Sequence, residues 1–484
     1  MSAMMATVAG VEVSGEHFIG GERVGSDRRF DTISPVDCST LAQVARADSD
    51  LVDRAVRAAH GAFPAWAALG TVSRAQRLHR LAELIERDIE AIAQVECADM
   101  AMLLRSLRAR VIARGARNFR SYADLAVAYE ERDWHSSGTW NRVQRMPAGP
   151  AAVITPWNAP FMLSTWKCAP ALAAGCTVVL KPAEWSPLSC SLLAGLAHEA
   201  GFPAGVFNVV QGIGEEAGAA LVSHPLIRRV SFTGSPETAR QIAVAAGANL
   251  VPFTGELGGK GPLIVFDDAD LDAAANKAAG MYDDAGQVCL AGTRLLVQAS
   301  SRESFLERFH AAVDRHVLGD PRDERTTISP LIHPDHLARV EGFVQRAVAN
   351  GDRLVRGGKR TEGLWFEPTL FEPLDNDSEI VQREVFGPVL TFQTFEDEDH
   401  AIALANSTPY GLSGIVYTGS MGRADRVGRA VRAGVVWVNT FLVRDLTAPF
   451  GGVGISGIGR EGGDLALDFY SDLKTLQILD GSVS

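Results

Sequence analysis

The chemistry of this chain centres on a cysteine and a glutamate that lie in two glycine-rich turns. Cys289 ends the run Gly286-Gln287-Val288-Cys289, and Glu256 lies some thirty residues earlier in Gly255-Glu256-Leu257-Gly258-Gly259-Lys260. A thiolate can attack an electrophilic carbon, and a carboxylate can deprotonate the water that releases the covalent product. Small buried cysteines are also common core residues, so Cys289 alone does not decide between a nucleophile and a packing residue.

Composition and charge limit the possible partners. The 484 residues are too many for one hydrophobic core, so two or three domains are expected. The net charge of −12 leaves no basic excess to neutralise phosphates, which predicts no nucleic-acid partner. The six cysteines contain no CxxC pair and no zinc-like spacing. This pattern predicts neither a disulfide framework nor a metal site, and it is typical of the reducing cytoplasm.

No segment has the pattern of a signal or a membrane span. Residues 1–18 lack an apolar signal core, and the longest uncharged run, 148–166, is interrupted by Pro150, Pro156 and Pro160. We therefore expect a cytoplasmic protein without membrane contact, in which the uncharged run forms a buried strand, loop and helix.

Two kinds of secondary structure must position the cysteine and the glutamate. Residues from Asp50 to about Tyr129 are expected to be helical, with Ser49 or Asp50 as the first N-cap. From Ala151 onward, short apolar strands alternate with helices, which indicates a parallel sheet covered on both faces. The expected strands are 152–154, 177–180, 206–210 and 229–232, and the expected helices are 161–173, 187–200, one from about 215 and one from 236.

Polar side chains follow three of these strands, at the sheet edge where ligands bind. The motifs are Thr155-Pro156-Trp157-Asn158, Lys181-Pro182-Ala183-Glu184 and Phe232-Thr233-Gly234-Ser235. Lys181 and Glu184 could bind a ribose, and Ser235 starts a helix whose N-terminus could bind a pyrophosphate. Each motif alone is more often structural, and no GxGxxG run is present. Their repetition at successive strand ends favours a nucleotide site.

Two further segments suggest substrate and subunit contacts. An arginine-rich helix puts Arg110, Arg114 and Arg117 on one face, which either faces water or turns Arg114 inward to bind a substrate carboxylate. Residues 127–145 contain a Ser136-Ser137-Gly138 turn and predict a hairpin whose unpaired edges contact another subunit.

From about residue 15 to about 475, the chain resembles the aldehyde dehydrogenase superfamily. The resemblance rests on the three strand-end motifs, the two glycine-rich turns, Glu384-Val385-Phe386-Gly387-Pro388 and Pro449-Phe450-Gly451-Gly452. The tail, with Arg444-Asp445-Leu446 and Gly459-Arg460-Glu461-Gly462-Gly463, is most similar to the hydroxymuconic and 5-carboxymethyl-2-hydroxymuconate semialdehyde dehydrogenases. Those enzymes serve the meta-cleavage degradation of aromatic compounds.

The resemblance implies a covalent mechanism with NAD. Cys289 would form a thiohemiacetal and then a thioester, the Asn158 amide and the Cys289 N–H would form the oxyanion hole, and Glu256 would activate the hydrolytic water. Lys181 and Glu184 would hold the adenosine ribose, and because Glu184 repels a 2′-phosphate, NADP is disfavoured. The other implied cofactor residues are Thr155, Pro156, Trp157, Pro182, Ala183, Gly214, Phe232, Thr233, Gly234, Ser235, Leu257, Gly258, Glu384 and Phe386.

Some positions depart from the family pattern and leave the substrate open. Gly255 replaces a common leucine and is expected to loosen the nicotinamide pocket. Thr447 stands where the semialdehyde group often has a further arginine, which favours a less acidic aldehyde. The expected substrate residues are Arg114, Met162, Trp166, Val288, Leu290, Arg444 and Phe450, with Leu442 nearby; for Met162 and Trp166 the alternative is a helix core.

The implied fold is α/β and has three parts. A Rossmann-type parallel-sheet cofactor domain spans 1–126 and 146–255, a second α/β catalytic domain spans 256–465, and 127–145 with 466–484 form a β-hairpin oligomerisation element. We expect a homodimer or homotetramer that oxidises a small aldehyde, a semialdehyde from aromatic degradation, without a metal. The alternatives are a broad-specificity aromatic or aliphatic aldehyde dehydrogenase, a CoA-acylating relative, and an inactive binding protein. Glu256 argues against the acylating alternative, and the intact set of Cys289, Asn158, Glu256 and Glu384 argues against the inactive one.

Overall fold

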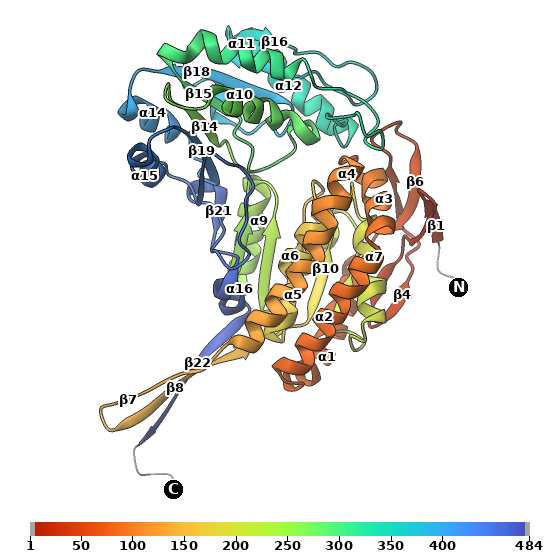
Figure 1. Ribbon diagram of the computed structural model, residues 1–484. Coiled ribbons are helices and arrows are strands. Elements are labelled where there is room, and N and C mark those ends of the chain that lie inside the picture. The colour runs from red at the N-terminus through yellow and green to blue at the C-terminus, as the bar shows by residue number, and fades with distance from the viewer. Residues whose placement is uncertain (1–4, 480–484) are drawn as a thin grey trace.

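The computed structural model describes residues 5–479 and places two α/β sheets above a protruding three-stranded arm (Figure 1). The first sheet has the strand order β21-β13-β12-β9-β10-β11-β3-β4, and the second has the order β16-β17-β18-β15-β14-β19-β20. The arm consists of β22-β8-β7. The predicted α/β fold class with two sheets and a separate β element is confirmed by this arrangement.

The first sheet is parallel across its centre, where β11, β10, β9, β12 and β13 lie side by side. Its strands are β3 (His17–Ile19), β4 (Glu22–Val24), β9 (Ala151–Ile154), β10 (Val178–Lys181), β11 (Phe207–Val209), β12 (Arg229–Thr233), β13 (Phe253–Glu256) and β21 (Gly457–Ile458). Its helices and helical turns are α1 (Ser49–Ala68), α2 (Thr71–Arg87), α3 (Ile89–Met100), α4 (Leu104–Ser106), η1 (Leu107–Val111), α5 (Ile112–Ala128), α6 (Pro160–Ala174), α7 (Leu188–Glu199), η2 (Gly214–Gly218), α8 (Ala219–Val222), α9 (Pro236–Ala248) and α16 (Gly463–Phe469).

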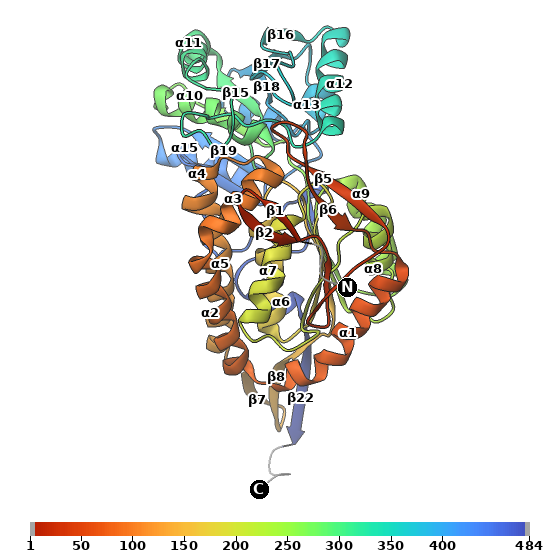
Figure 2. The same ribbon diagram turned by 90° about the vertical axis from the view of Figure 1, so that its right-hand side faces the viewer.

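Alternation along the strands buries both faces of this sheet. In β9, Ala151 and Val153 pack into the core formed with α2, α5, α6 and α7, whereas Ala152 and Ile154 pack into the core formed with α1, α8 and α9. Figure 2 shows the sheet between these two helix layers. Because a strand buried on both faces has no polar side, the continuous apolar runs in the sequence predicted it correctly.

The second sheet follows the same rule. Leu263 and Val265 of β14 face the larger core, and Ile264 faces a smaller core under α14 and α15. The strands are β14 (Pro262–Val265), β15 (Arg294–Gln298), β16 (Arg353–Arg356), β17 (Thr369–Glu372), β18 (Val389–Phe395), β19 (Ser413–Tyr417) and β20 (Val435–Val438). The helices and helical turns are α10 (Leu271–Ala279), η3 (Gly280–Gly286), η4 (Ala299–Ser301), α11 (Arg302–Val313), α12 (Pro334–Asn350), α13 (Glu379–Gln382), α14 (Glu398–Ala405), α15 (Met421–Ala430) and η5 (Gly454–Ser456).

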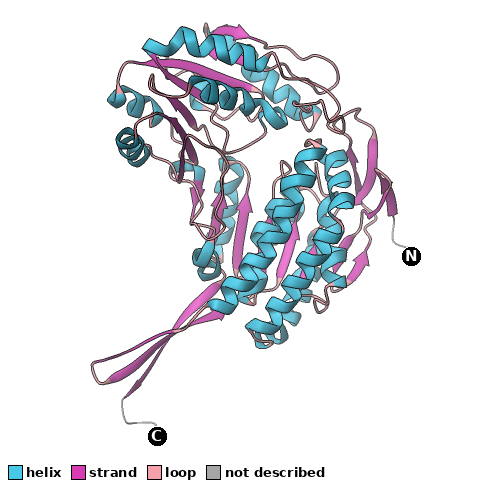
Figure 3. Ribbon diagram, viewed as in Figure 1, coloured by secondary structure: helices cyan, strands magenta, loops and turns pink. Residues whose placement is uncertain are grey.

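The arm extends the predicted hairpin with a strand from the C-terminal tail. Its strands are β7 (Arg132–Ser136), β8 (Thr139–Pro147) and β22 (Ser471–Leu479). The β7–β8 turn has positive φ at Ser137 and Gly138, which suits a tight hairpin. The full length of β22 pairs with β8, so segments from opposite ends of the chain form one ribbon, drawn as strands in Figure 3. Residues 480–484 of the predicted tail element lie outside the described residues.

Two boundaries differ from the predictions. The first helix is capped by Asp48, not by Ser49 or Asp50, because the Asp48 carboxylate accepts the N–H groups of Asp50 and Leu51 from an extended backbone. The expected 127–145 hairpin starts later, because α5 continues to Ala128.

Two small sheets complete the N-terminal region. They consist of β1 (Met5–Val8) with β2 (Val11–Ser14), and of β5 (Arg29–Ile33) with β6 (Thr40–Ala45). β21 joins the first sheet although its residues fall within the range expected for the catalytic domain; the division at 255/256 stays a prediction. Within residues 5–479, no helix is both long and apolar enough to cross a membrane.

Candidate active site

Residues from both sheets meet at the candidate nucleophile. Glu256 is the last residue of β13, Asn158 follows β9, and Cys289 lies in the loop between η3 and β15. Cys289 is half-buried. The Nδ2 of Asn158 donates a hydrogen bond to the carbonyl of Gln287 at 2.9 Å. This bond ties the strand end of the first sheet to the cysteine turn of the second and leaves one amide hydrogen of Asn158 for a ligand.

A tight left-handed turn presents Cys289. Asp284, Ala285 and Gly286 have φ values of 53°, 54° and 69°. A Cβ at position 286 would lie 2.3 Å from the carbonyl oxygen of Gly387, so only glycine fits there. The strained backbone at Asp284 and Ala285 is typical of functional sites, where surrounding contacts hold an unfavourable conformation.

The electrostatics of the site keep its acidic groups protonated. Burial, with the carboxylates of Glu384 and Glu256, raises the pKa of the Cys289 thiol to about 12. Burial, with the carboxylate of Glu461, also raises the pKa of Glu256 well above its usual value. Neither carboxylate oxygen of Glu256 has a hydrogen-bond partner within residues 5–479. Only the ionised form of Glu256 can take a proton from a thiol or a water molecule, and the raised pKa makes that form less populated at neutral pH.

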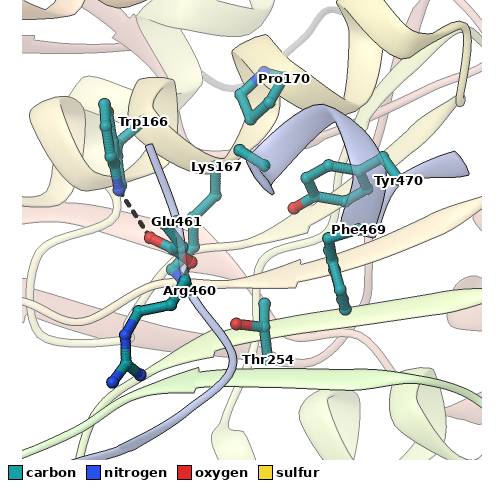
Figure 4. A pocket seen from close by; sticks show the side chains of 9 residues that line it. Trp166, Lys167, Pro170, Thr254, Arg460, Glu461, Phe469 and Tyr470 are labelled. Carbon is teal, nitrogen blue, oxygen red and sulfur yellow. Dashed lines mark hydrogen bonds and ion pairs between the residues drawn. The ribbon is translucent and has the colours of Figure 1, made fainter. Parts of the chain in front are cut away.

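A buried ion pair behind Glu256 was missed by the sequence analysis. The Lys167 amino group donates to Glu461 at 2.5 Å and to the Ser231 hydroxyl at 3.0 Å. The indole N–H of Trp166 donates to the other Glu461 oxygen at 2.6 Å, as Figure 4 shows. The available signals were a lysine in the otherwise uncharged helix α6 and a glutamate in the quoted tail motif. Neither signal could reveal the pairing of residues so far apart in the chain.

Replacement of Glu461 by glutamine should move the pH profile of the enzyme to lower pH. A neutral side chain at 461 removes the negative charge that raises the pKa of Glu256, and it leaves the positive charge of Lys167, which lowers that pKa. Both changes favour the ionised, basic form of Glu256, so the acid limb of kcat should shift downward by about one pH unit. Steady-state rates measured against pH check this, and an acid limb that stays in place or moves upward contradicts it.

The strand-end motifs form a polar edge along the first sheet. The Lys181 amino group binds the Glu184 carboxylate at 2.8 Å. Burial opposes ionisation of Glu184, but Lys181 and the N–H of Gly214 outweigh it and hold its pKa below the usual value. At the end of β12, the Ser235 hydroxyl caps α9 by accepting the Thr238 N–H at 3.1 Å. A Cβ at Gly234 would lie 2.4 Å from the Phe232 ring, so that turn requires glycine.

The loop that carries Glu384 is held by helix α12. The His336 ring nitrogen lies 2.7 Å from the carbonyl of Phe386, and Arg339 donates to the carbonyls of Val385 and Glu384 at 2.7 and 3.0 Å. Phe386 has a positive φ of 60°, a strained conformation that these bonds support. On the other side, the Glu384 carboxylate accepts the Gly259 N–H at 2.8 Å.

The other expected cofactor residues line the same edge. The Trp157 ring meets the Phe386 ring edge-on at 5.2 Å, and the Thr155 hydroxyl lies 2.9 Å from that of Ser164. A Cβ at Gly258 would lie 2.1 Å from the Glu384 carboxylate. The space left by Gly255 is filled by the Phe253 ring, 2.9 Å from a would-be Cβ, so the pocket is not loosened there. Pro182, Phe232 and Leu257 are buried, while Pro156, Ala183 and Thr233 are half-buried.

Two arginines flank Trp166. The Arg114 guanidinium lies over its ring at 5.2 Å, and that of Arg444 lies at 5.4 Å and also stacks on Phe450 at 3.8 Å. Within residues 5–479, neither arginine has a carboxylate at ion-pair distance. Burial and the charge of Arg444 lower the pKa of Arg114 to about 10. The neighbouring Arg110 and Arg117 are exposed, so Arg114 differs from the rest of the predicted arginine face.

The apolar substrate candidates differ in how far their side chains are exposed. Met162 and Val288 are half-buried, and Leu442 is 38% exposed. Leu290 lies in the core of the second sheet. Thr447, at the position of the missing arginine, is exposed, and its hydroxyl donates to the Asp445 carboxylate at 2.8 Å.

Comparison with known proteins identifies the family. The model of the aldehyde dehydrogenase family matches residues 23–476. The chain belongs to the aldehyde dehydrogenase family. It is 40% identical to 2-hydroxymuconic semialdehyde dehydrogenase of Pseudomonas sp. (strain CF600), over 95% of this chain and 98% of that protein. It is also 40% identical to (Z)-2-((N-methylformamido)methylene)-5-hydroxybutyrolactone dehydrogenase of Acinetobacter baylyi, over 95% and 96%.

Solved structures agree with this aldehyde dehydrogenase assignment. HpcC from Thermus thermophilus has a TM-score of 0.94 and 43% identity, over 97% of this chain and 96% of that one. An indole-3-acetaldehyde dehydrogenase bound to NAD+ has a TM-score of 0.95 and 40% identity, over 97% of both chains. The predicted family, fold class, enzyme class and NAD cofactor are confirmed. This chain is an aldehyde-oxidising enzyme.

Proposed function

We propose that this aldehyde dehydrogenase oxidises a carboxylate-bearing semialdehyde from aromatic ring cleavage. The observation that carries the proposal is the arginine pair around Trp166. Two like charges in a half-buried site are unfavourable, and although the carboxylates of Glu256 and Glu461 partly offset the charge of Arg444, a bound anion would stabilise the pair further. A substrate carboxylate between Arg114 and Arg444 would supply charge-assisted hydrogen bonds to both guanidinium groups. The similarity to a 2-hydroxymuconic semialdehyde dehydrogenase supports a substrate of this class.

The arginine pair also lies at a suitable place for an aldehyde to reach Cys289. The charge of Arg444 acts on both Glu256 and Cys289, so its guanidinium is near the reacting groups. A semialdehyde with its carboxylate at Arg444 could therefore place its other end at the thiol. Trp166 and Phe450 present aromatic faces that are already covered by arginine, which favours an anionic substrate over a neutral aromatic one.

Each catalytic residue then has one task. Cys289, once its proton has been removed, adds to the aldehyde carbon. The free amide hydrogen of Asn158 and the Cys289 N–H stabilise the oxyanion. Bound NAD would supply the acceptor for the hydride that leaves the resulting thiohemiacetal, so Cys289 would then carry a thioester. Glu256 removes a proton from the water that hydrolyses this thioester.

The polar edge of the first sheet fits NAD. Lys181 and Glu184 would hold the adenosine ribose, and the N-terminus of α9 at Ser235 would face the pyrophosphate. The hydroxyl of Thr233 is buried beside this helix start and has no hydrogen-bond partner within residues 5–479. Glu384 would hold the nicotinamide ribose, with Phe386 against the ring.

The substrate proposal predicts a selective loss in arginine variants. Arg444→Ala and Arg114→Ala should each raise KM for hydroxymuconic semialdehyde about 10- to 100-fold, the effect of losing a charge-assisted hydrogen bond. For benzaldehyde and aliphatic aldehydes the change should stay within about threefold. NADH formation over an aldehyde panel, with NAD or NADP, measures this.

Arg117→Ala provides the matched control, because Arg117 is exposed on the same helix as Arg114. It should leave every KM unchanged. Equal losses for acidic and neutral aldehydes would reject the carboxylate site and favour the broad-specificity alternative. A rate that requires added CoA would favour the acylating alternative, against which the unpartnered carboxylate of Glu256 argues.

We also propose that the arm joins subunits into a dimer or tetramer in the cytoplasm. The arm projects away from both sheets (Figure 1), and every residue of β7 is exposed. β22 and β7 are the edge strands of the three-stranded sheet, and Leu473 on β22 is 61% exposed. All six cysteines are free thiols, which supports a reducing compartment.

The oligomer proposal predicts dissociation when the arm is altered. Leu473→Asp should shift the mass in light scattering toward the monomer at micromolar concentration, because a charge opposes burial in an interface. Met421→Asp is the control, since Met421 is exposed on α15, away from the arm. A monomeric wild type, or an unchanged mass for Leu473→Asp, contradicts the proposal.

A further inference from the structure

Lys260 is a buried lysine with no task in the mechanism above. It ends the glycine-rich turn that starts at Gly255, and it is 2% exposed. Its amino group has no hydrogen-bond partner within residues 5–479. A buried amino group is unfavourable unless a polar or charged group faces it, so its surroundings require an explanation.

Lys260 lines a small cavity together with Glu384. The cavity has a volume of about 10 Å³ and is also lined by Thr293, Val288 and Phe386. The Thr293 hydroxyl, like the Lys260 amino group, has no hydrogen-bond partner in the described part of the chain. A space of this size holds at most one water molecule. Lys260, Thr293 and Glu384 thus border one small space.

Backbone contacts fix the relative position of Lys260 and Glu384. The Glu384 carboxylate accepts the N–H of Gly259, the residue before Lys260, at 2.8 Å. The Lys260 carbonyl accepts the Nε of Arg294 at 2.8 Å. Arg294 is itself buried and also donates to the carbonyls of Leu404 and Ala405 at 2.7 Å. The turn therefore cannot move away from the Glu384 loop without breaking several buried hydrogen bonds.

We propose that Lys260, which borders this cavity together with Glu384, is a positioning residue whose amino group keeps the Glu384 carboxylate ionised and oriented for the cofactor ribose. The proposal rests on the role in cofactor binding proposed for Glu384. Lys260 acts through that carboxylate and touches neither the cofactor nor the reacting atoms.

The charges around the pair set the direction of the effect. Burial raises the pKa of Glu384 to about 7. The Gly259 N–H and the charges of Arg339 and Lys260 lower this pKa but do not outweigh burial. Burial and the charges of Arg294 and Arg339 lower the pKa of Lys260 to about 7, whereas the Glu384 carboxylate raises it. Without the amino group, the Glu384 carboxyl loses a stabilising neighbour and becomes protonated at higher pH. The charge of Glu237 also raises the pKa of Glu384. The charge of Glu384 in turn raises the pKa of Cys289 and of Tyr410.

The test is the pH dependence of NAD binding to the full chain, measured as a dissociation constant by protein fluorescence between about pH 6 and 9. In Lys260→Met, the pH at which binding weakens should rise by about one unit, which makes Kd about tenfold higher on the acid side. Thr293→Val is the matched control, because it removes an uncharged polar group from the same cavity; it should leave this pH unchanged. Lys260→Gln serves as the second variant if Lys260→Met does not fold, with the same expected shift.

The variants are then combined with Glu384→Gln. If Lys260 acts through the carboxylate, Lys260→Met should have no further effect on Kd in the Glu384→Gln background. An unshifted pH dependence, or an equal effect in both backgrounds, overturns the proposal. A Glu384→Gln variant that binds NAD as tightly as the wild type overturns the role of Glu384 as well, and this result is distinct from the other two.

Discussion

Replacement of Cys289 by alanine is expected to lower kcat at least about 10⁴-fold while NAD binding stays intact. Loss of a covalent nucleophile has effects of this size, because the remaining groups cannot form the intermediate. The side chain of Cys289 is half-buried and packs only at the margin of the core of the second sheet, so the small loss of volume in alanine should not unfold the protein. NADH formation and NAD binding by fluorescence measure the two effects separately.

The ionisation of Cys289 adds a second expectation. Because burial and two carboxylates raise the pKa of its thiol to about 12, the resting enzyme holds a thiol at neutral pH. Reaction with a thiol reagent should therefore be slow at pH 7 and should become faster as the pH rises toward 12. Cys38→Ser is the control, since Cys38 is exposed and far from the site in sequence. Turnover that survives in Cys289→Ala would contradict the covalent mechanism.

The sequence predicted the strand ends well because their signal is local. Runs such as Ala151–Ile154 are apolar throughout, and the polar residue after each run falls at the edge where ligands bind. The predicted ends of helices and hairpins were less accurate, because several neighbouring residues can serve as the cap or the turn. Asp48 caps α1 instead of its neighbours, since its backbone is extended and its carboxylate reaches two N–H groups.

The groups that surround the catalytic residues could not be predicted, because they depend on distant pairings. Lys167 and Glu461 come from α6 and from the segment before α16, and only the fold brings them together behind Glu256. The sequence predicts a looser nicotinamide pocket at Gly255, because glycine has no side chain. In the structure the Phe253 ring occupies that space. Lys260 was visible in a quoted motif, but only the folded structure shows that its amino group has no hydrogen-bond partner among residues 5–479.

The arginine face illustrates the same limit at the substrate end of the site. Helical spacing predicts Arg110, Arg114 and Arg117 on one face, yet spacing cannot tell which of them turns toward the protein. That choice depends on Trp166, which comes from another helix and offers Arg114 an aromatic face. The second arginine, Arg444, comes from a loop far along the chain. The charge of this cluster depends on residues from three separate segments, so it cannot be predicted until the fold is known.

Replacement of Glu256 by glutamine should separate the two halves of the reaction. Glutamine keeps the shape of the side chain but cannot accept a proton, so hydrolysis of the thioester should slow about 10²- to 10⁴-fold, the usual contribution of a general base. Formation of the thioester should still release one NADH per subunit. Stopped-flow absorbance should thus show a burst of one equivalent followed by a slow steady state. Glu307→Gln is the control, because Glu307 is an exposed glutamate on α11 and should leave both phases unchanged.

The burst phase also shows whether Glu256 removes the proton of the Cys289 thiol or only a proton of the hydrolytic water. Both the thiol of Cys289 and the hydrolytic water need a base, and the unpartnered carboxylate of Glu256 is buried near both. If Glu256 serves only the water, the burst in Glu256→Gln keeps its rate, and an added nucleophile such as hydroxylamine should restore turnover by attacking the thioester. If the burst disappears together with the steady state, the role as water activator alone is wrong, and Glu256 must act before the hydride leaves. The raised pKa of Cys289 makes this comparison sensitive, because a thiol that is protonated at rest cannot react until some group has taken its proton.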